Sequence, residues 1–323
     1  MRADAGFAAR DARSGSRRPG ARPDLARTPR VAAWDVAGDP AAALRRVPAF
    51  VALAPHRLLL VAPGGAPPPA VVAAAADAGL RVAVRVPPGA ATPAYVRGVA
   101  AAGAARIVLA LAAPDDAGAA DAAAAVHAGG LALEVETTLR PATAAFVDPA
   151  GRVAAALGPV LWRVVFTVPP APGVHDFPAA TTEAIFRRLV AWHRRTGVPV
   201  ATTNAPAFRR VLLSSGIRHP HPLPLGDGKG LVYVSRSGRI QPSEYLPLGA
   251  GDVDADRLVD VYRHGRLFRT LRAAARLEGR CGRCLFRAIC GGSRARALAA
   301  RGALLGDDPA CAYGRTSPAC SAA

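Results

Sequence analysis

Residues 279–313 read GRCGRCLFRAICGGSRARALAARGALLGDDPACAY and hold four of the five cysteines of the chain. Their spacing is C-x2-C-x5-C-x20-C, at Cys281, Cys284, Cys290 and Cys311. Thiolates gathered at short spacing are the ligands of iron-sulfur clusters and structural zinc sites, because one tight turn can aim two sulfurs at one centre and a second segment completes the coordination. This stretch therefore predicts a metal site.

The four cysteines also allow two interpretations without a metal. They could be ordinary thiols that are close in sequence by chance, or they could form disulfides. A C-x2-C pair is typical of metal or redox sites in a reducing compartment, and we find no sign of export in the sequence. The pattern therefore favours a cytoplasmic protein, and Cys320, in a polar tail, is interpreted as an incidental free thiol.

The length of 323 residues and the hydrophobic content of 51% allow a large core, with room for one barrel-sized domain and a smaller appendage. Gly, Pro and Arg interrupt every apolar run before the roughly 18 to 20 residues that a transmembrane helix requires. We therefore expect a globular protein without a membrane-spanning segment.

The net charge of +18 suggests nucleic-acid binding at first sight, because basic patches neutralise phosphates. However, the arginines are scattered through every segment, Lys229 is the only lysine, and no aromatic stacking set accompanies them. Specific nucleic-acid binding is therefore not predicted. The charge could still attract an anionic substrate or an acidic partner protein.

From residue 31 onward, short apolar runs alternate with alanine-rich helical stretches. Continuous apolar strands separated by helices are typical of a parallel sheet that helices cover. The pattern predicts an α/β fold, either a full or partial (β/α) barrel or an open doubly wound sheet, which periodicity alone cannot separate. The expected strands lie within residues 31–36, 58–65, 80–86, 105–112, 131–139 and 160–168, with 199–204 as a further candidate.

The sequence changes character near residue 225. Two alternating runs, LVYVS and RIQPS, are joined by Arg-Ser-Gly and predict a β-hairpin, and a helical stretch leads from there to the cysteines. We therefore expect a barrel at 31–225 and a small cysteine-rich domain at 226–314. The Arg-rich residues 1–30 are expected to be a disordered tail, and 315–323 a flexible one.

Residues 226–313 resemble the C-terminal SPASM-type domain of radical S-adenosylmethionine (SAM) enzymes. The resemblance rests on the hairpin GDGKGLVYVSRSGRIQPSEYLPLGAGDV and on CGRCLFRAICGGSRARALAARG followed by DDPACAY. It is closest to the branch with heme-biosynthesis-like and peptide-maturase-like members. It implies that Cys281, Cys284, Cys290 and Cys311 bind one auxiliary [4Fe-4S] cluster. Zinc held by the same four thiolates is the alternative metal.

Residues 31–225 resemble the partial TIM-like (β/α) barrel of the same family, with altered chemistry. Family members carry C-x3-C-x2-C after the first strand, and these cysteines hold the cluster that binds and cleaves SAM. Aligned from Trp34, the three positions fall on Pro40, Leu44 and Val47, whose side chains cannot bind iron. The resemblance thus implies that the SAM cluster cannot form in the usual way.

The second SAM motif is partly retained. The GGEP-type loop of the family corresponds to Gly64, Gly65, Ala66 and Pro67, where alanine replaces the acidic residue. Residues 110–116, ALAAPDD, stand in the place of the family's SLDG motif. Gly64 and Gly65 are therefore a degenerate SAM loop, and SAM binding is left open.

Four functional interpretations follow from the resemblance. We prefer a catalytically degenerate radical SAM/SPASM protein that keeps one [4Fe-4S] cluster and acts as an accessory, binding or electron-transfer partner of an active relative, because the complete C-terminal cysteine set is retained. The alternatives are an active enzyme that modifies a peptide or a tetrapyrrole with unusual cluster ligands, a zinc-stabilised module, and a protein that has lost its function. Whether the chain is an enzyme stays open.

Three basic residues near the cysteines each allow two interpretations. Lys229 could face a substrate or could only shape the start of the hairpin. Arg294 and Arg296 could offset the charge of a cluster or bind an anion, or they could be exposed helix arginines.

Overall fold

The computed structural model describes residues 24–36, 38–113, 116–170, 176–218 and 225–314. The expected tails at 1–30 and 315–323 thus lie outside the described residues, apart from 24–30. That short segment lies against the C-terminal helices, since Arg263 Nε donates to the carbonyl of Arg27 at 3.0 Å and Arg272 Nη1 donates to that of Ala26 at 3.2 Å. The domain limits given above remain predictions.

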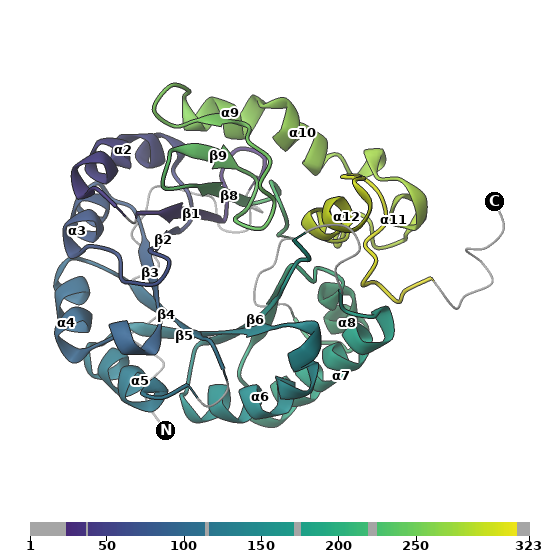
Figure 1. Ribbon diagram of the computed structural model, residues 1–323, viewed down its shortest axis with the longest axis horizontal. Coiled ribbons are helices and arrows are strands. Elements are labelled where there is room, and N and C mark those ends of the chain that lie inside the picture. The colour runs from purple at the N-terminus through teal and green to yellow at the C-terminus, as the bar shows by residue number, and fades with distance from the viewer. Residues whose placement is uncertain (1–23, 37, 114–115, 171–175, 219–224, 315–323) are drawn as a thin grey trace.

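Every apolar run expected to be a strand forms one in the described part of the chain (Figure 1). The strands are β1 (Val31–Asp35), β2 (Leu58–Val61), β3 (Val82–Val86), β4 (Arg106–Leu111), β5 (Ala132–Leu139), β6 (Leu161–Phe166) and β7 (Val200–Thr203). The helices that accompany them are α2 (Pro40–Leu53), α3 (Pro69–Asp77), α4 (Pro93–Ala101), α5 (Ala119–Ala128), α6 (Val147–Ala156), α7 (Ala179–Thr196) and α8 (Phe208–Ser214).

The seven strands are parallel and lie side by side in chain order, from β1 to β7. This sequential order excludes the doubly wound alternative, in which the strand order reverses at a switch point. Figure 1 shows the sheet curved into an arc with the helices on its outer side. Because β7 forms one edge and does not pair with the other end of the sheet, the barrel is partial, as expected.

The predicted hairpin is confirmed, and it extends the barrel sheet. Strand β8 (Leu231–Val234) pairs in parallel with β1, and the antiparallel strands β9 (Arg239–Gln241) and β10 (Gly251–Asp252) follow it outward. The helices α9 (Leu258–His264), α10 (Arg266–Arg272), α11 (Gly279–Arg283) and α12 (Arg294–Arg301) complete the chain. Figure 1 places α11 and α12 at the open side of the sheet, between the hairpin and α8.

The core lies between the outer face of the sheet and the helices. Trp34 of β1 is fully buried and stacks on Phe50 of α2, with ring centroids 4.6 Å apart. Trp34 can reach the helix layer because successive side chains of a strand point to opposite faces of the sheet. The described residues include no helix long and apolar enough to cross a membrane.

Gly151 marks a close approach of two helices. A Cβ atom at this position of α6 would lie 2.5 Å from the ring of Trp192 on α7, and that ring is held by a hydrogen bond from its Nε1 to Asp148 Oδ1 at 2.9 Å. Gly98 in α4 has room, since a Cβ there would meet only the ring of Pro69, at 3.9 Å.

We expect Gly151→Ala to lower the free energy of unfolding by about 1 to 3 kcal/mol, because the methyl group overpacks the Trp192 contact. Gly98→Ala is the matched control and should raise it by about 0.5 to 1 kcal/mol, since alanine is the better helix former. Urea unfolding of the full chain measures both. Equal effects of the two substitutions would contradict the packing assigned to α6 and α7.

Candidate functional site

The four cysteines implicated in metal binding lie in one segment that folds against the open side of the barrel. Cys281 lies in α11, Cys284 follows it, Cys290 precedes α12, and Cys311 lies in the last described loop. All four are partly buried and form no disulfide. Cys290 and Cys311 also pack against the main hydrophobic core. The structure therefore gathers the predicted ligands in one region and leaves them unpaired by disulfides.

The sulfur atoms receive N–H groups from the surrounding chain. Phe286 N donates to Cys284 Sγ and Gly292 N to Cys290 Sγ, each at 3.4 Å, and Arg294 Nη2 lies 3.8 Å from Cys281 Sγ. N–H donors and a guanidinium beside sulfur stabilise a thiolate over a thiol. The surroundings thus suit sulfur that carries negative charge.

Burial acts in the opposite direction on the same groups. It raises the pKa of Cys290 to about 12 and that of Cys311 to about 11, and it also raises the pKa of Cys281. Thiols with these pKa values stay protonated near neutral pH, and a thiolate-binding metal would displace their protons. The segment therefore has the chemistry of a metal-ligand set and a low reactivity as free thiols.

Gly292 brings the backbone close to Cys281. Its φ is +64°, and a Cβ there would lie 2.5 Å from Arg294 Nη2 and 3.1 Å from Cys281 Sγ. The glycine thus leaves space beside the sulfur that a side chain would fill. The cysteines fit a thiolate-bound group in kind, but no three His, Cys, Asp or Glu side chains of the described residues are arranged to hold a metal ion.

Two neighbouring aspartates hold the loops that carry the cysteines. Asp307 Oδ1 accepts a hydrogen bond from Cys281 N at 3.1 Å, and Asp308 Oδ2 accepts one from Ser293 N at 2.8 Å. Asp308 Oδ1 also accepts from Ala310 N at 3.1 Å. These aspartates were not predicted from the sequence. Aspartate directly before proline is typical of turns, however, so the run Asp307-Asp308-Pro309 indicated that their side chains could hydrogen-bond the loop backbone.

Arg294 and Arg296 of α12 are buried, so their interpretation as exposed helix residues is wrong. Arg294 donates to the carbonyls of Leu304 at 3.0 Å and Gly306 at 2.7 Å, in addition to its contact with Cys281. Its guanidinium therefore connects the segment after α12 to the first cysteine. This contact agrees with the interpretation in which the arginine offsets charge on the sulfur.

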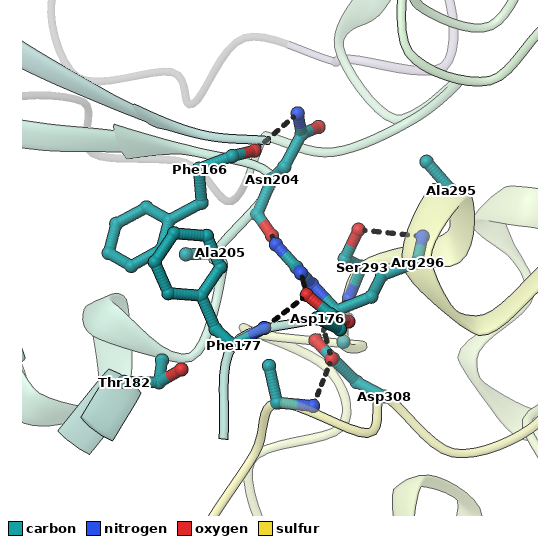
Figure 2. Close-up of polar contacts among 12 residues, drawn as sticks. Phe166, Asp176, Phe177, Thr182, Asn204, Ala205, Ser293, Ala295, Arg296 and Asp308 are labelled. Carbon is teal, nitrogen blue, oxygen red and sulfur yellow. Dashed lines mark hydrogen bonds and ion pairs between the residues drawn. The ribbon is translucent and has the colours of Figure 1, made fainter. Parts of the chain in front are cut away.

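Arg296 joins α12 to the barrel, as Figure 2 shows. It is 0% exposed, forms an ion pair with Asp176, and lies 3.8 Å from Asp308 Oδ1 through its Nε. Its Nη2 lies 3.4 Å from the carbonyl oxygen of Asn204, which follows β7, and its guanidinium lies 5.7 Å from the ring of Phe177. A fully buried cation is tolerated only when it is paired in this way.

Lys229 also connects the hairpin to the cysteine segment. Its Nζ donates to the carbonyl of Ala288 at 2.6 Å, and the neighbouring Asp227 Oδ2 accepts from Ala295 N at 3.0 Å. The contact of Lys229 with the backbone favours its structural interpretation over a substrate-facing one.

The positions of the missing SAM-cluster cysteines fall on a helix. Asp39 caps α2, its carboxylate accepting from Ala41 N at 2.9 Å and Ala42 N at 3.2 Å, and Pro40 is the first helical residue. Val47 is 6% exposed in the core, whereas Leu44 is 40% exposed. Aspartate before proline is a strong helix start, so the chain turns into α2 only a few residues after β1.

The loop of Gly64 and Gly65, predicted above to be a degenerate SAM loop, follows β2. Gly64 has a φ of +76°, and no atom lies within 4 Å of a Cβ built on Gly64 or Gly65. Pro67 accepts a hydrogen bond through its carbonyl from Tyr95 Oη at 2.9 Å, which ties the end of the loop to α4. The loop is therefore open, with its glycines not covered by described parts of the chain.

Charged side chains line a cavity of about 150 Å³ on the inner side of the barrel. Glu134 of β5 is paired with Arg57 at 2.8 Å, with Arg163 at 3.3 Å and with Arg106. Burial acts to raise the pKa of Glu134, but the three arginines outweigh it and lower the pKa to about 2. These residues were not among those predicted from the sequence.

A second charged group lines the same cavity. Arg85 of β3 binds Glu244 through two hydrogen bonds, at 2.8 and 3.0 Å, and lies 3.5 Å from Glu136. Burial raises the pKa of Glu136, and the nearby Glu244 adds to the effect. Charged residues at alternate positions of apolar strands, as in VAVRV and ALEVETTL, were the signal for an inner polar face.

We expect Glu134 to make the free energy of unfolding depend on pH in acid. The folded pKa of about 2 lies below the value of about 4.3 for an unfolded glutamate, so the stabilisation is complete above the unfolded pKa and is lost as the pH falls toward 2. Glu134→Gln should remove up to a few kcal/mol at neutral pH and flatten this acid limb. Urea unfolding at stepped pH checks it, and an unchanged slope in the variant would refute the pairing.

No protein-family model matches the chain. Among curated proteins, it is 26% identical over 197 residues to the AdoMet-dependent heme synthase of Methanosarcina barkeri, which covers 56% of each chain. It is 28% identical over 174 residues to the AdoMet-dependent heme synthase of Nitratidesulfovibrio vulgaris, covering 49% of this chain and 47% of the relative. The chain thus spans about half the length of the curated relatives it matches.

Solved structures share the fold. SuiB of Streptococcus suis bound to S-adenosylmethionine superposes with a TM-score of 0.63 at 11% identity, covering 88% of this chain and 78% of SuiB. The structure of anSMEcpe with bound AdoMet and the Cp18Cys peptide has a TM-score of 0.63 at 10% identity and covers 88% of this chain and 94% of that one. The chain thus shares the fold of these structures, and its curated relatives support the resemblance to the radical SAM family.

Proposed function

We propose that this protein is a catalytically degenerate member of its family, which holds one auxiliary [4Fe-4S] cluster and serves as an accessory or electron-transfer partner. The observation that carries the proposal is α2. A helix capped by Asp39 occupies the chain where the family's SAM-cluster cysteines would lie, with Pro40, Leu44 and Val47 in their places. A side-chain replacement by Asp39 is disfavoured, because both of its carboxylate oxygens accept N–H groups of the helix start.

Cys281, Cys284, Cys290 and Cys311 would hold the auxiliary cluster, which supplies one-electron transfer when bound. The protein contributes N–H groups at the sulfurs, the guanidinium of Arg294 and a largely apolar packing on one side. These features support negative charge on sulfur and limit the access of water, the two means by which a protein tunes such a centre.

A peptide is the ligand class that we propose for the barrel. Two of the solved structures with this fold contain peptides, namely SuiB with the precursor peptide SuiA and anSMEcpe with Cp18Cys. A tetrapyrrole is the second class, suggested by the heme synthase names of the curated relatives. An active partner enzyme of the same family would supply the radical chemistry that this chain lacks.

We expect anaerobic reconstitution of the full chain to give about four irons and about four sulfides per chain, as one [4Fe-4S] cluster requires. Cys281→Ser, Cys284→Ser, Cys290→Ser and Cys311→Ser should each lower the iron content severalfold and bleach the charge-transfer absorption, because oxygen replaces a thiolate ligand. Cys320→Ser is the matched control and should behave like the wild type.

Three results would contradict this assignment. Stoichiometric zinc in place of iron in protein purified with both metals present would indicate the structural zinc module. Iron loss in Cys320→Ser equal to that in the other variants would show that the ligand set is different. About eight irons per chain would reveal a second cluster that the α2 geometry does not accommodate.

A further inference from the structure

The carboxylate of Glu134 is outnumbered by the cations around it. Arg57, Arg106 and Arg163 all contact it, from the segment before β2, from β4 and from β6. Glu134 is 1% exposed, and the three arginine side chains are between 17% and 22% exposed. Arginine remains protonated at physiological pH, so this cluster carries more positive than negative charge. Such a surplus in a partly buried place favours a further anion.

The nearest other carboxylate lies in the neighbouring charged group. Arg163 Nε lies 3.9 Å from Glu136 Oε2, beyond hydrogen-bond distance, and Glu136 and Glu244 both face Arg85. The second group has two glutamates for one arginine, so the two groups together hold four arginines and three glutamates and keep one positive charge in excess.

Most N–H groups of the three arginines are not used by protein acceptors within the described residues. Arg57 and Arg106 each donate one hydrogen bond to Glu134 Oε1, and Arg163 donates one to Oε2. A guanidinium carries several N–H donors in a planar fork that matches the oxygens of a carboxylate or a phosphate. Several arginine N–H groups in this cluster are thus available to donate hydrogen bonds to a bound anion.

The cavity gives this cluster room for a ligand. Arg57, Arg163 and Glu134 line it, and its volume of about 150 Å³ exceeds by about tenfold what a single water needs. Asn204 and Ser293 line it on the side where the cysteine segment closes the barrel. A small molecule could therefore reach the arginines from the interior of the barrel.

We propose that the inner side of the barrel binds a small oxyanion, a carboxylate or a phosphate, at Arg57, Arg106 and Arg163. This inference goes beyond the proposed function, and it requires neither the cluster nor a peptide. Burial and the two neighbouring arginines lower the pKa of Arg57 to about 10, so its cation would gain from an additional negative charge. Glu134 holds the three arginines in place and competes with the incoming anion.

The experiment is isothermal titration calorimetry of the full chain with sodium phosphate and with sodium malonate, each against sodium chloride at matched ionic strength. Saturable binding of both probes indicates a general oxyanion site. Binding of malonate alone assigns a carboxylate ligand, and binding of phosphate alone assigns a phosphate ester. A response equal to that of chloride reflects charge screening and overturns the proposal.

Variants locate the site. Arg57→Gln and Arg163→Gln each remove one charged fork from the cavity wall and should weaken binding about tenfold. Arg187→Gln on the exposed side of α7 is the matched control, with unchanged affinity expected. Unfolding curves without anion identify any variant that fails to fold, and using two arginine variants keeps the test decisive.

Glu134→Gln separates a binding role from a structural one. Loss of the competing carboxylate should tighten anion binding severalfold, and phosphate should raise the melting temperature of this variant more than that of the wild type. A purely structural cluster predicts the reverse, namely that all variants lose stability and none responds to phosphate. Unchanged affinity in both arginine variants would also overturn the proposal.

Discussion

The buried guanidinium of Arg296 joins the cysteine segment to the barrel. It lies in the first turn of α12 and contacts Asp176, Asp308 and the carbonyl of Asn204 at the end of β7. A charge taken out of water must be paired, and loss of one partner typically costs several kcal/mol because the others stay buried. Asp308 also binds the backbone of Ser293, so the same network orders the chain beside Cys290. This cation therefore helps to fix the cysteines against the barrel, together with the contacts of Lys229 and Asp227.

The chain starts a helix at the point where the resemblance to radical SAM enzymes predicts three cluster-binding cysteines. Asp39 and Pro40 supply the cap and the first helical residue, and Val47 contributes to the core. Apolar contacts such as Trp34 on Phe50, on the outer side of the sheet, stabilise the barrel.

The interior of the barrel is lined by charged side chains. Its arginines and glutamates form two charged groups, one with two glutamates around Arg85 and one with three arginines around Glu134. Burying such charges costs free energy. They are therefore found where every charge has hydrogen-bonding partners in the protein, or where the charges bind a ligand. The surplus at Glu134 points to the second case.

Much of the fold could be predicted from the sequence, because it rests on local patterns. Apolar runs separated by helical stretches indicated all seven parallel strands, and Arg-Ser-Gly between alternating runs indicated the hairpin of β8 and β9. The pairing of β8 with β1 could not be predicted, since nothing local specifies which edge a hairpin joins. The burial of Arg296 was also beyond reach, because its partner Asp176 is far away in sequence. The charged inner face could have been predicted, because Arg85, Glu134 and Arg163 interrupt the apolar runs of their strands.

The most direct test of the central claim, that the SAM-cleaving centre has been lost, is the yield of 5'-deoxyadenosine from the reconstituted and chemically reduced full chain incubated with SAM. Mass spectrometry quantifies the product against a sample without protein. The account predicts no product above that background, while the C-terminal cluster is present and reducible in the same sample. Product formed in excess over protein would contradict it, since repeated cleavage requires a site-differentiated cluster that Pro40, Leu44 and Val47 cannot hold.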